Sequence, residues 1–220
     1  MLPGNTIGLL DFGMVGRLDE SVYRRRRIAA AALLVILVSV CMWLVKAVSA
    51  TNDATGARPR FGEHPDQGGS CLAQLMFHAS LHADLALHAV VMDAAPLIHH
   101  WRDRLGLAGL RPHQGLPEAE DPAVVSTIDV PALLDYAQAV HHATAEWVGA
   151  ADLTMLDKIP PASDRLHASG GVSVEAVPWL HAMWADKPIS WFVQWECSGH
   201  WLNHLGEMIS VRNRMGLSPF

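Results

Sequence analysis

Two histidines, His200 and His204, lie four residues apart in a stretch without proline from residue 191 to residue 215. Residues i and i+4 of an α-helix lie one above the other on the same face. Two imidazoles placed in this way can bind one divalent transition metal ion, with the remaining ligands supplied by another part of the chain. The pair alone does not establish a metal site, because the chain contains 13 histidines and some pairs at this spacing arise by chance.

A third imidazole is available from an earlier apolar stretch. His78 follows Phe77, and His82 lies one helical turn further on, so these two histidines form a second i, i+4 pair. If the two stretches form helices that pack side by side, three or four imidazoles converge on one point. A lone histidine among apolar neighbours is more often a core residue than a ligand, so the spacing permits this convergence without demonstrating it.

The composition restricts the class of protein. Half of the 220 residues are hydrophobic, and the formal net charge is −6 with a pI near 6.1. This charge gives no general reason to expect nucleic acid as a partner. The three cysteines are widely spaced and lack a CxxC pattern, which favours a reducing, cytoplasmic location over a disulfide framework or a cysteine zinc finger.

Long helical stretches alternate with connectors rich in proline and glycine. Ser70 is the predicted N-cap of a helix over 71–105, which the sequence around 93–96 kinks or interrupts. No β-type alternation stands out, so the pattern predicts an all-α fold, a four-helix bundle with long crossover connections. The further predicted helices lie at 131–150, at 172–184 and from residue 188 onward.

The first helix of this bundle would come from residues 28–45, an apolar run that follows the arginines at 24–27. Two interpretations stay open, a buried bundle helix and a single-pass membrane anchor. The run is rich in alanine and its length falls at the lower edge of what a membrane span needs. We therefore favour the bundle helix and a cytoplasmic protein, with membrane association as the alternative.

The two histidine stretches together resemble the DinB-like family, which includes DinB, YfiT and the mycothiol-dependent maleylpyruvate isomerases. One helix of that family reads roughly aliphatic-x-x-aromatic-His with an Asp six residues later, and Phe77, His78 and Asp84 match the aromatic, His and Asp positions. The closing helix of the family carries an HxxxH-x-G-E pattern, which residues 200–207 match. The resemblance covers residues 28–220 and implies a DinB-like four-helix bundle. It also implies a divalent metal site formed by His78, His200 and His204.

The resemblance implies a thiol-dependent S-transferase or isomerase as the activity. A zinc, nickel or iron ion, which the sequence does not distinguish, would bind a low-molecular-weight thiol as thiolate, lower its pKa and orient it for attack on an electrophile. A metal-bound water acting as a hydrolytic nucleophile is a nearby variant. The partners would be a small thiol and an electrophile, and a homodimer is compatible with such a bundle. The alternative is a non-catalytic, stress-associated metal-binding bundle, with a membrane tether through residues 28–45 in one version.

Three further residues are candidates for supporting the site. Glu207 lies one turn after His204, where it either accepts a hydrogen bond from an imidazole or is a solvated helix residue. His82 is expected to support the ligands or line the pocket rather than to act as a fourth ligand, and Asp84 is placed in the same group. The adjacent pairs at 99–100 and 141–142 point in different directions on a helix, so we expect them on solvated faces.

The N-terminal residues carry a second, shorter resemblance. Residues 2–18 resemble the metal-binding stretch of the UbiB-type atypical kinases, in which a Pro-Gly-Asn and an Asp-Phe-Gly hold magnesium around ATP phosphates. Asn5 and Asp11 occupy those positions. The nucleotide-covering loop and the catalytic base of such kinases would lie upstream of this stretch. We therefore expect no kinase activity and interpret residues 1–27 as a kinase-like remnant or tail.

Overall fold

The structure is a computed structural model of the chain and describes residues 60–64, 69–108 and 127–216. Every regular element among these residues is helical, and none of them forms a strand. The predicted all-α class is therefore confirmed for this part of the chain. The kinase-like segment and the proposed first helix at 28–45 lie outside the described residues.

The first long helix, α2, spans Leu72–Asp84 and begins one residue later than the sequence suggested. Its N-cap is Cys71 rather than the predicted Ser70. The Cys71 Sγ accepts a hydrogen bond from the Gln74 backbone N–H at 3.4 Å, and the Gln74 side chain accepts one from the Cys71 N–H at 3.3 Å. This reciprocal pair satisfies two N–H groups that a helix start would otherwise leave unpaired.

The helix continues through a π-helical segment, η2 (Leu85–Val91), and then stops. Of the two outcomes left open at 93–96, the structure has an interruption. Asp93 adopts a φ of 54°, outside the helical region, and the short helix α3 (Ile98–Trp101) follows. This is one of the two outcomes that the sequence predicted, because Pro96 has no N–H with which to continue the helical hydrogen bonds.

The second long helix, α5 (Val130–Ala150), begins where its proline predicted. Asp129 is the N-cap and its carboxylate accepts a hydrogen bond from the Ala132 N–H at 2.8 Å. Pro131 occupies the first turn, where the missing N–H costs nothing. One expectation on this helix fails, because His141 is only 7% exposed and lies inside the bundle.

Short helices form most of the connection that leads to the final helix. The α6 helix was not predicted, because the prolines at 160 and 161 were interpreted as breakers. Proline immediately before or within a first turn is compatible with a helix start, and α6 begins directly after them. The connecting elements are η3 (Leu153–Met155), α6 (Ala162–Ala168) and α7 (Pro178–Trp184).

The final helix is one continuous rod made of three segments, two of them α-helical and one π-helical. It begins as α8 (Ile189–Trp191), widens into the π-helical segment η4 (Phe192–Gly199) and ends as α9 (His200–Arg214). The residues at both junctions have right-handed helical dihedral angles, so the chain does not break there. The predicted start near residue 188 is confirmed.

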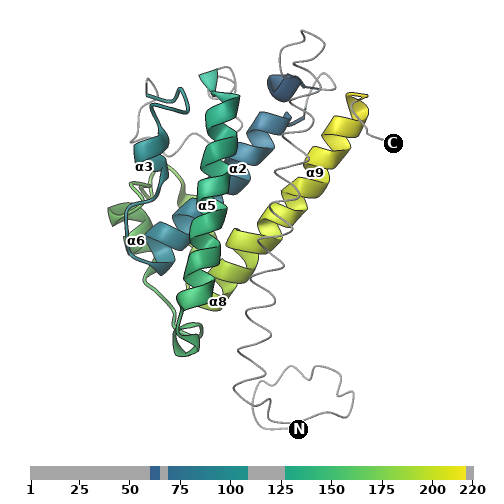
Figure 1. Cartoon of the computed structure of the whole chain (residues 1–220). Helices are drawn as coiled ribbons and strands as arrows, with labels where there is room; N and C mark the ends of the chain where they lie inside the picture. The colour runs from purple at the N-terminus through teal and green to yellow at the C-terminus, as the bar shows by residue number, and fades with distance from the viewer. Residues whose placement is uncertain (1–59, 65–68, 109–126, 217–220) are drawn as a thin grey trace, which may run out of the picture.

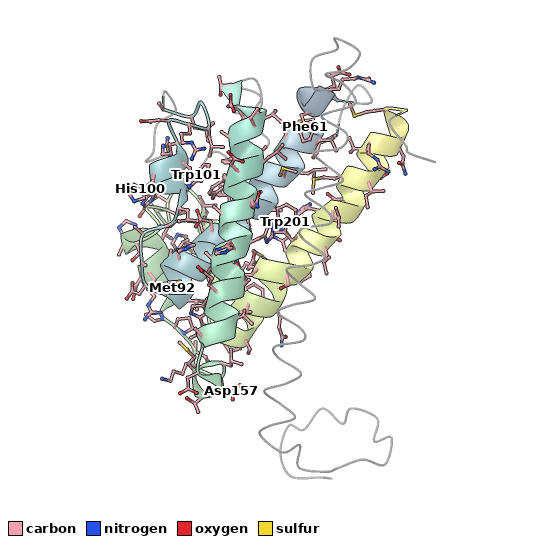
Figure 2. All side chains as sticks on the ribbon, viewed as in Figure 1. Phe61, Met92, His100, Trp101, Asp157 and Trp201 are labelled. Carbon is pink, nitrogen blue, oxygen red and sulfur yellow. The ribbon has the colours of Figure 1, made fainter. Side chains whose placement is uncertain are left out.

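The α2 helix lies between α5 and α9 and packs against both (Figure 1). It is the central element of the described bundle, since every one of its residues except His78 is buried. On the α5 side, Trp201 of α9 contacts His141, with ring centroids 4.5 Å apart (Figure 2). Within the described part of the chain, no helix combines the length and the apolar character that crossing a membrane requires.

Candidate metal centre

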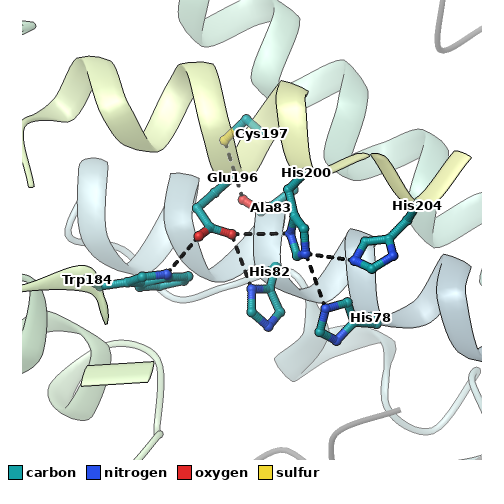
Figure 3. Close-up of polar contacts among 8 residues, drawn as sticks. All are labelled: His78, His82, Ala83, Trp184, Glu196, Cys197, His200 and His204. Carbon is teal, nitrogen blue, oxygen red and sulfur yellow. Dashed lines mark hydrogen bonds and ion pairs between the residues drawn. The ribbon is translucent and has the colours of Figure 1, made fainter. Parts of the chain in front are cut away.

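Four histidines from α2 and α9 meet where these helices pack together (Figure 3). His78 and His82 are one turn apart on α2, and His200 and His204 are one turn apart on α9. The ring centroid of His78 lies 5.0 Å from that of His200 and 4.9 Å from that of His204. The structure therefore brings the predicted ligands His78, His200 and His204 together, and places His82 beside them.

The imidazole nitrogens lie close to one another across the two helices. Nε2 of His200 lies 3.3 Å from Nε2 of His78 and 2.8 Å from Nε2 of His204. With tetrahedral geometry and metal–nitrogen bonds of 2.0–2.1 Å, ligand nitrogens would be roughly 3.3 Å apart. His78, His82 and His200 also each offer one nitrogen within 4.8 Å of the other two. Three imidazoles are thus close enough to bind a metal ion.

The hydrogen-bond partners of the rings decide which nitrogens are free to bind metal. His204 Nδ1 lies 2.9 Å from Oε2 of Glu207, and His200 Nδ1 lies 3.3 Å from Oε2 of Glu196 at ion-pair distance, without hydrogen-bond alignment. An ionised carboxylate only accepts, so the Nδ1 of His204 carries a proton and its Nε2 presents a lone pair. That lone pair lies 2.8 Å from Nε2 of His200, where it accepts a hydrogen bond from His200 or, with a metal present, binds the ion together with His200.

Glu196 is the residue of this site that the sequence interpretation missed. Its side chain is fully buried, with Oε2 lying 3.2 Å from His82 Nδ1 and Oε1 accepting a hydrogen bond from Trp184 Nε1 at 2.8 Å (Figure 3). A signal was available, because Glu196 precedes His200 by four residues and therefore lies on the same helix face.

The pKa of Glu196 reflects two opposing effects. Burial alone would raise the pKa of this carboxyl group, but its contacts with His200 and His82 outweigh that effect and lower the pKa to about 2. Glu196 is therefore an anion at neutral pH. It is placed to orient two imidazoles and to balance part of the charge of a dication.

Two of the histidines, His78 and His204, are held in the neutral form. Burial and, to a lesser extent, the neighbouring imidazoles lower the pKa of His78 to about 3. Burial also lowers the pKa of His204, although Glu207 acts in the opposite direction. Neutral imidazole is the form that binds metal, so the site does not need to release protons from these two rings at pH 7.

Glu207 belongs to the edge of the site. Its side chain is 49% exposed, and its second oxygen lies 3.5 Å from Nδ2 of Asn203. Of the two roles left open for Glu207, the structure supports the first: Glu207 accepts a hydrogen bond from His204. The same side chain is also in contact with solvent.

Asp84 stabilises the fold. Within the described part of the chain, none of the hydrogen bonds or ion pairs of its carboxylate is with a histidine of the cluster. Its two oxygens accept hydrogen bonds from the Leu97 and Ile98 N–H groups at 2.9 and 2.8 Å, which caps α3. They also accept one from the Tyr136 hydroxyl at 2.7 Å and lie 2.7 Å from His88 Nδ1. Asp84 therefore joins α2, α3 and α5 on the other side of α2 from the metal centre.

Comparison with known proteins adds no family, since no family model matches the chain and no curated protein is similar to it at a significant level. The chemistry of the site must therefore be argued from its own residues. Those residues are four convergent imidazoles and two carboxylates that contact the Nδ1 atoms of His82, His200 and His204.

Proposed function

We propose that this protein binds one divalent transition metal ion between α2 and α9 and uses it to activate a low-molecular-weight thiol for transfer to an electrophile. The observation that supports the metal most directly is the convergence of three Nε2 atoms, since Nε2 of His200 lies 3.3 Å from that of His78 and 2.8 Å from that of His204. The Nδ1 atoms of His200 and His204 are turned toward Glu196 and Glu207. In metalloproteins a ligating histidine usually directs its other nitrogen to such an acceptor.

The proposed ligands are His78, His200 and His204. His82 is placed in a supporting role, since its Nδ1 is already in contact with Glu196 Oε2 at 3.2 Å. Three protein ligands leave one position open in a tetrahedral site, which is the arrangement of catalytic rather than structural zinc. The proposed fold is a DinB-like four-helix bundle, in which α2, α5 and the rod from α8 to α9 would be three of the four helices.

A divalent ion held in this way lowers the pKa of a thiol that occupies the open position. The protein side chains then have two tasks. The buried anion Glu196 keeps His82 and His200 in fixed orientations, and its negative charge offsets part of the charge of the ion. The exposed Glu207 does the same for His204 at the solvent side, where small molecules can reach the site.

A second function, metal binding without catalysis, is favoured by one observation. A nitrogen of His82 lies within 4.8 Å of nitrogens of His78 and His200, so a rotation of this side chain could complete a closed set of four ligands. A closed set is typical of structural zinc sites. The proposal and this alternative differ in whether His82 is needed for binding the ion.

Metal analysis combined with thiol conjugation tests both functions. The purified chain is expected to hold about one divalent ion, and a screen of mycothiol, bacillithiol and glutathione with a model electrophile is expected to give metal-dependent conjugation. The His82→Ala variant should keep its metal if the proposal is correct. Loss of metal in that variant, together with no conjugation by the intact protein, would favour the closed binding site instead.

A further inference from the structure

Two half-exposed tryptophans lie against the histidine cluster. The indole of Trp179, on α7, is stacked on His82 with ring centroids 6.2 Å apart and an interplanar angle of 20°. The indole of Trp195, on η4, is stacked on His200 with centroids 5.9 Å apart and an angle of 24°. Two separate elements thus each place one flat aromatic side chain along a histidine of the proposed metal centre.

Both indoles leave a large apolar surface open to solvent. Trp179 is 45% exposed and Trp195 is 42% exposed. Trp184, which donates a hydrogen bond to Glu196, is by contrast fully buried. Met183 lies one turn after Trp179 on α7 and is 37% exposed. Exposed large apolar side chains beside polar, ligand-binding groups are typical of a small-molecule site.

Local backbone structure holds Trp195 in this position. In an α-helix, residues five apart lie on different faces, but the π-helical segment η4 closes a wider turn, and the His200 N–H bonds to the Trp195 carbonyl. Residue 199 is a glycine, and a Cβ there would lie 3.0 Å from Cε3 of Trp195. The wide turn and Gly199 together let the indole lie alongside the imidazole of His200.

We infer that Trp179 and Trp195 form a binding surface for a planar aromatic group, and that the electrophile which this protein takes is therefore aromatic. This inference rests on the proposed function, because the two indoles lie on histidines of the proposed metal centre. Indole faces bind flat rings by stacking, and such a pair gains affinity beyond the area that it buries. The exposed area of the two side chains supplies the surface for such a contact.

A matched pair of metal-binding probes separates the aromatic surface from the metal. Benzohydroxamate and acetohydroxamate carry the same chelating group, and only the first has a ring. Titration of the metal-loaded full-length chain, followed by calorimetry and by tryptophan fluorescence, is expected to show that benzohydroxamate binds about tenfold more tightly. Acetohydroxamate should bind without a comparable change in fluorescence.

Variants of the two tryptophans test the assignment. Trp179→Ala and Trp195→Ala should each lower the preference for the aromatic probe about threefold to tenfold, while metal content and acetohydroxamate affinity stay unchanged. The Phe variants should restore most of the preference. Ile159→Ala, which removes a 60% exposed apolar side chain, is the control and should change nothing.

The outcomes distinguish the two proposals. Equal affinity for both probes, or a preference that survives in both Ala variants, would overturn the aromatic surface and leave the metal function standing. A chain that holds no metal and binds neither hydroxamate would overturn the proposed function and this inference with it.

Discussion

His200 and His204 direct their Nε2 atoms at each other across 2.8 Å, while the Nδ1 atom of each ring faces a carboxylate. Without a metal ion, one of the two Nε2 atoms carries the proton that makes this contact a hydrogen bond. A metal ion bound by both Nε2 atoms would take the place of that hydrogen bond. This relationship makes the histidine pair on α9 the part of the site most sensitive to substitution.

The first prediction concerns metal content. Changing His204 to Ala should abolish stoichiometric metal binding, because it removes one of three ligands and leaves a weaker two-imidazole site. Helicity should be largely intact, since His204 lies at the edge of the bundle. Elemental analysis of the purified protein measures the metal, and circular dichroism measures the helix content.

His142→Ala is the matched control for this measurement. Its side chain is 72% exposed on α5, so it should keep about one ion per chain. Stoichiometric metal in the His204 variant would exclude the proposed set of ligands.

The second prediction concerns Glu196. Replacing it with Gln keeps the shape but removes the buried negative charge that contacts His82 and His200. Metal affinity should fall about 10–100-fold, the usual effect of losing an acceptor behind a ligating histidine. Competition with a chelator of known affinity measures the change. Glu207→Gln should have a smaller effect, because its carboxylate is half exposed and solvent can replace it, and an equal loss in both variants would contradict this assignment.

The third prediction concerns His141, a buried residue away from the proposed ligands. Both of its ring nitrogens lack a hydrogen-bond partner in the structure, and burial lowers its pKa to about 3. Changing His141 to Leu should therefore raise the free energy of unfolding at pH 7 by about 1–3 kcal/mol, because it removes unpaired buried polar groups. Urea denaturation measures this difference.

The same variant should also change the pH dependence of stability. The folded-state pKa of His141 lies below its ordinary value of 6.5, so the unfolded chain takes up the proton first as the pH falls. The wild-type residue thus costs stability below pH 6.5, increasingly down to about pH 3. The advantage of the Leu variant should be about 2 kcal/mol larger at pH 5 than at pH 7. His142→Leu, on the exposed face, should give no such widening, and a widening there would point to a general effect of acid.

The fourth prediction separates Asp84 from the metal centre. Asp84→Asn should lower the free energy of unfolding by about 3 kcal/mol or more, because an amide cannot accept all the bonds that the buried carboxylate accepts. Tyr136→Phe removes one of those bonds and should cost about 1.5 kcal/mol. The folded fraction of both variants should keep its metal. Loss of metal from well-folded Asp84→Asn protein would instead place Asp84 in the site.

The sequence by itself determined the local features of this protein. The spacing of His200 and His204 places them on one helix face wherever that helix packs, and Pro131 marks the first turn of α5 whatever its neighbours are. Features of this kind depend on residues within a few positions of one another, so local pattern alone is enough to predict them.

Only the tertiary structure decided which of the 13 histidines share a site. His78 and His200 are 122 positions apart, and their contact depends on how α2 packs against α9. The same packing buries His141, which the sequence had placed on a solvated face, and assigns Asp84 to the cap of α3 instead of to the cluster. Glu196 lay within reach of a local argument, but its importance comes from His82, which approaches it from a different helix. Long-range packing sets the environment of each polar side chain, and that environment is what turns a histidine or a carboxylate into a ligand, a supporting acceptor or a structural contact.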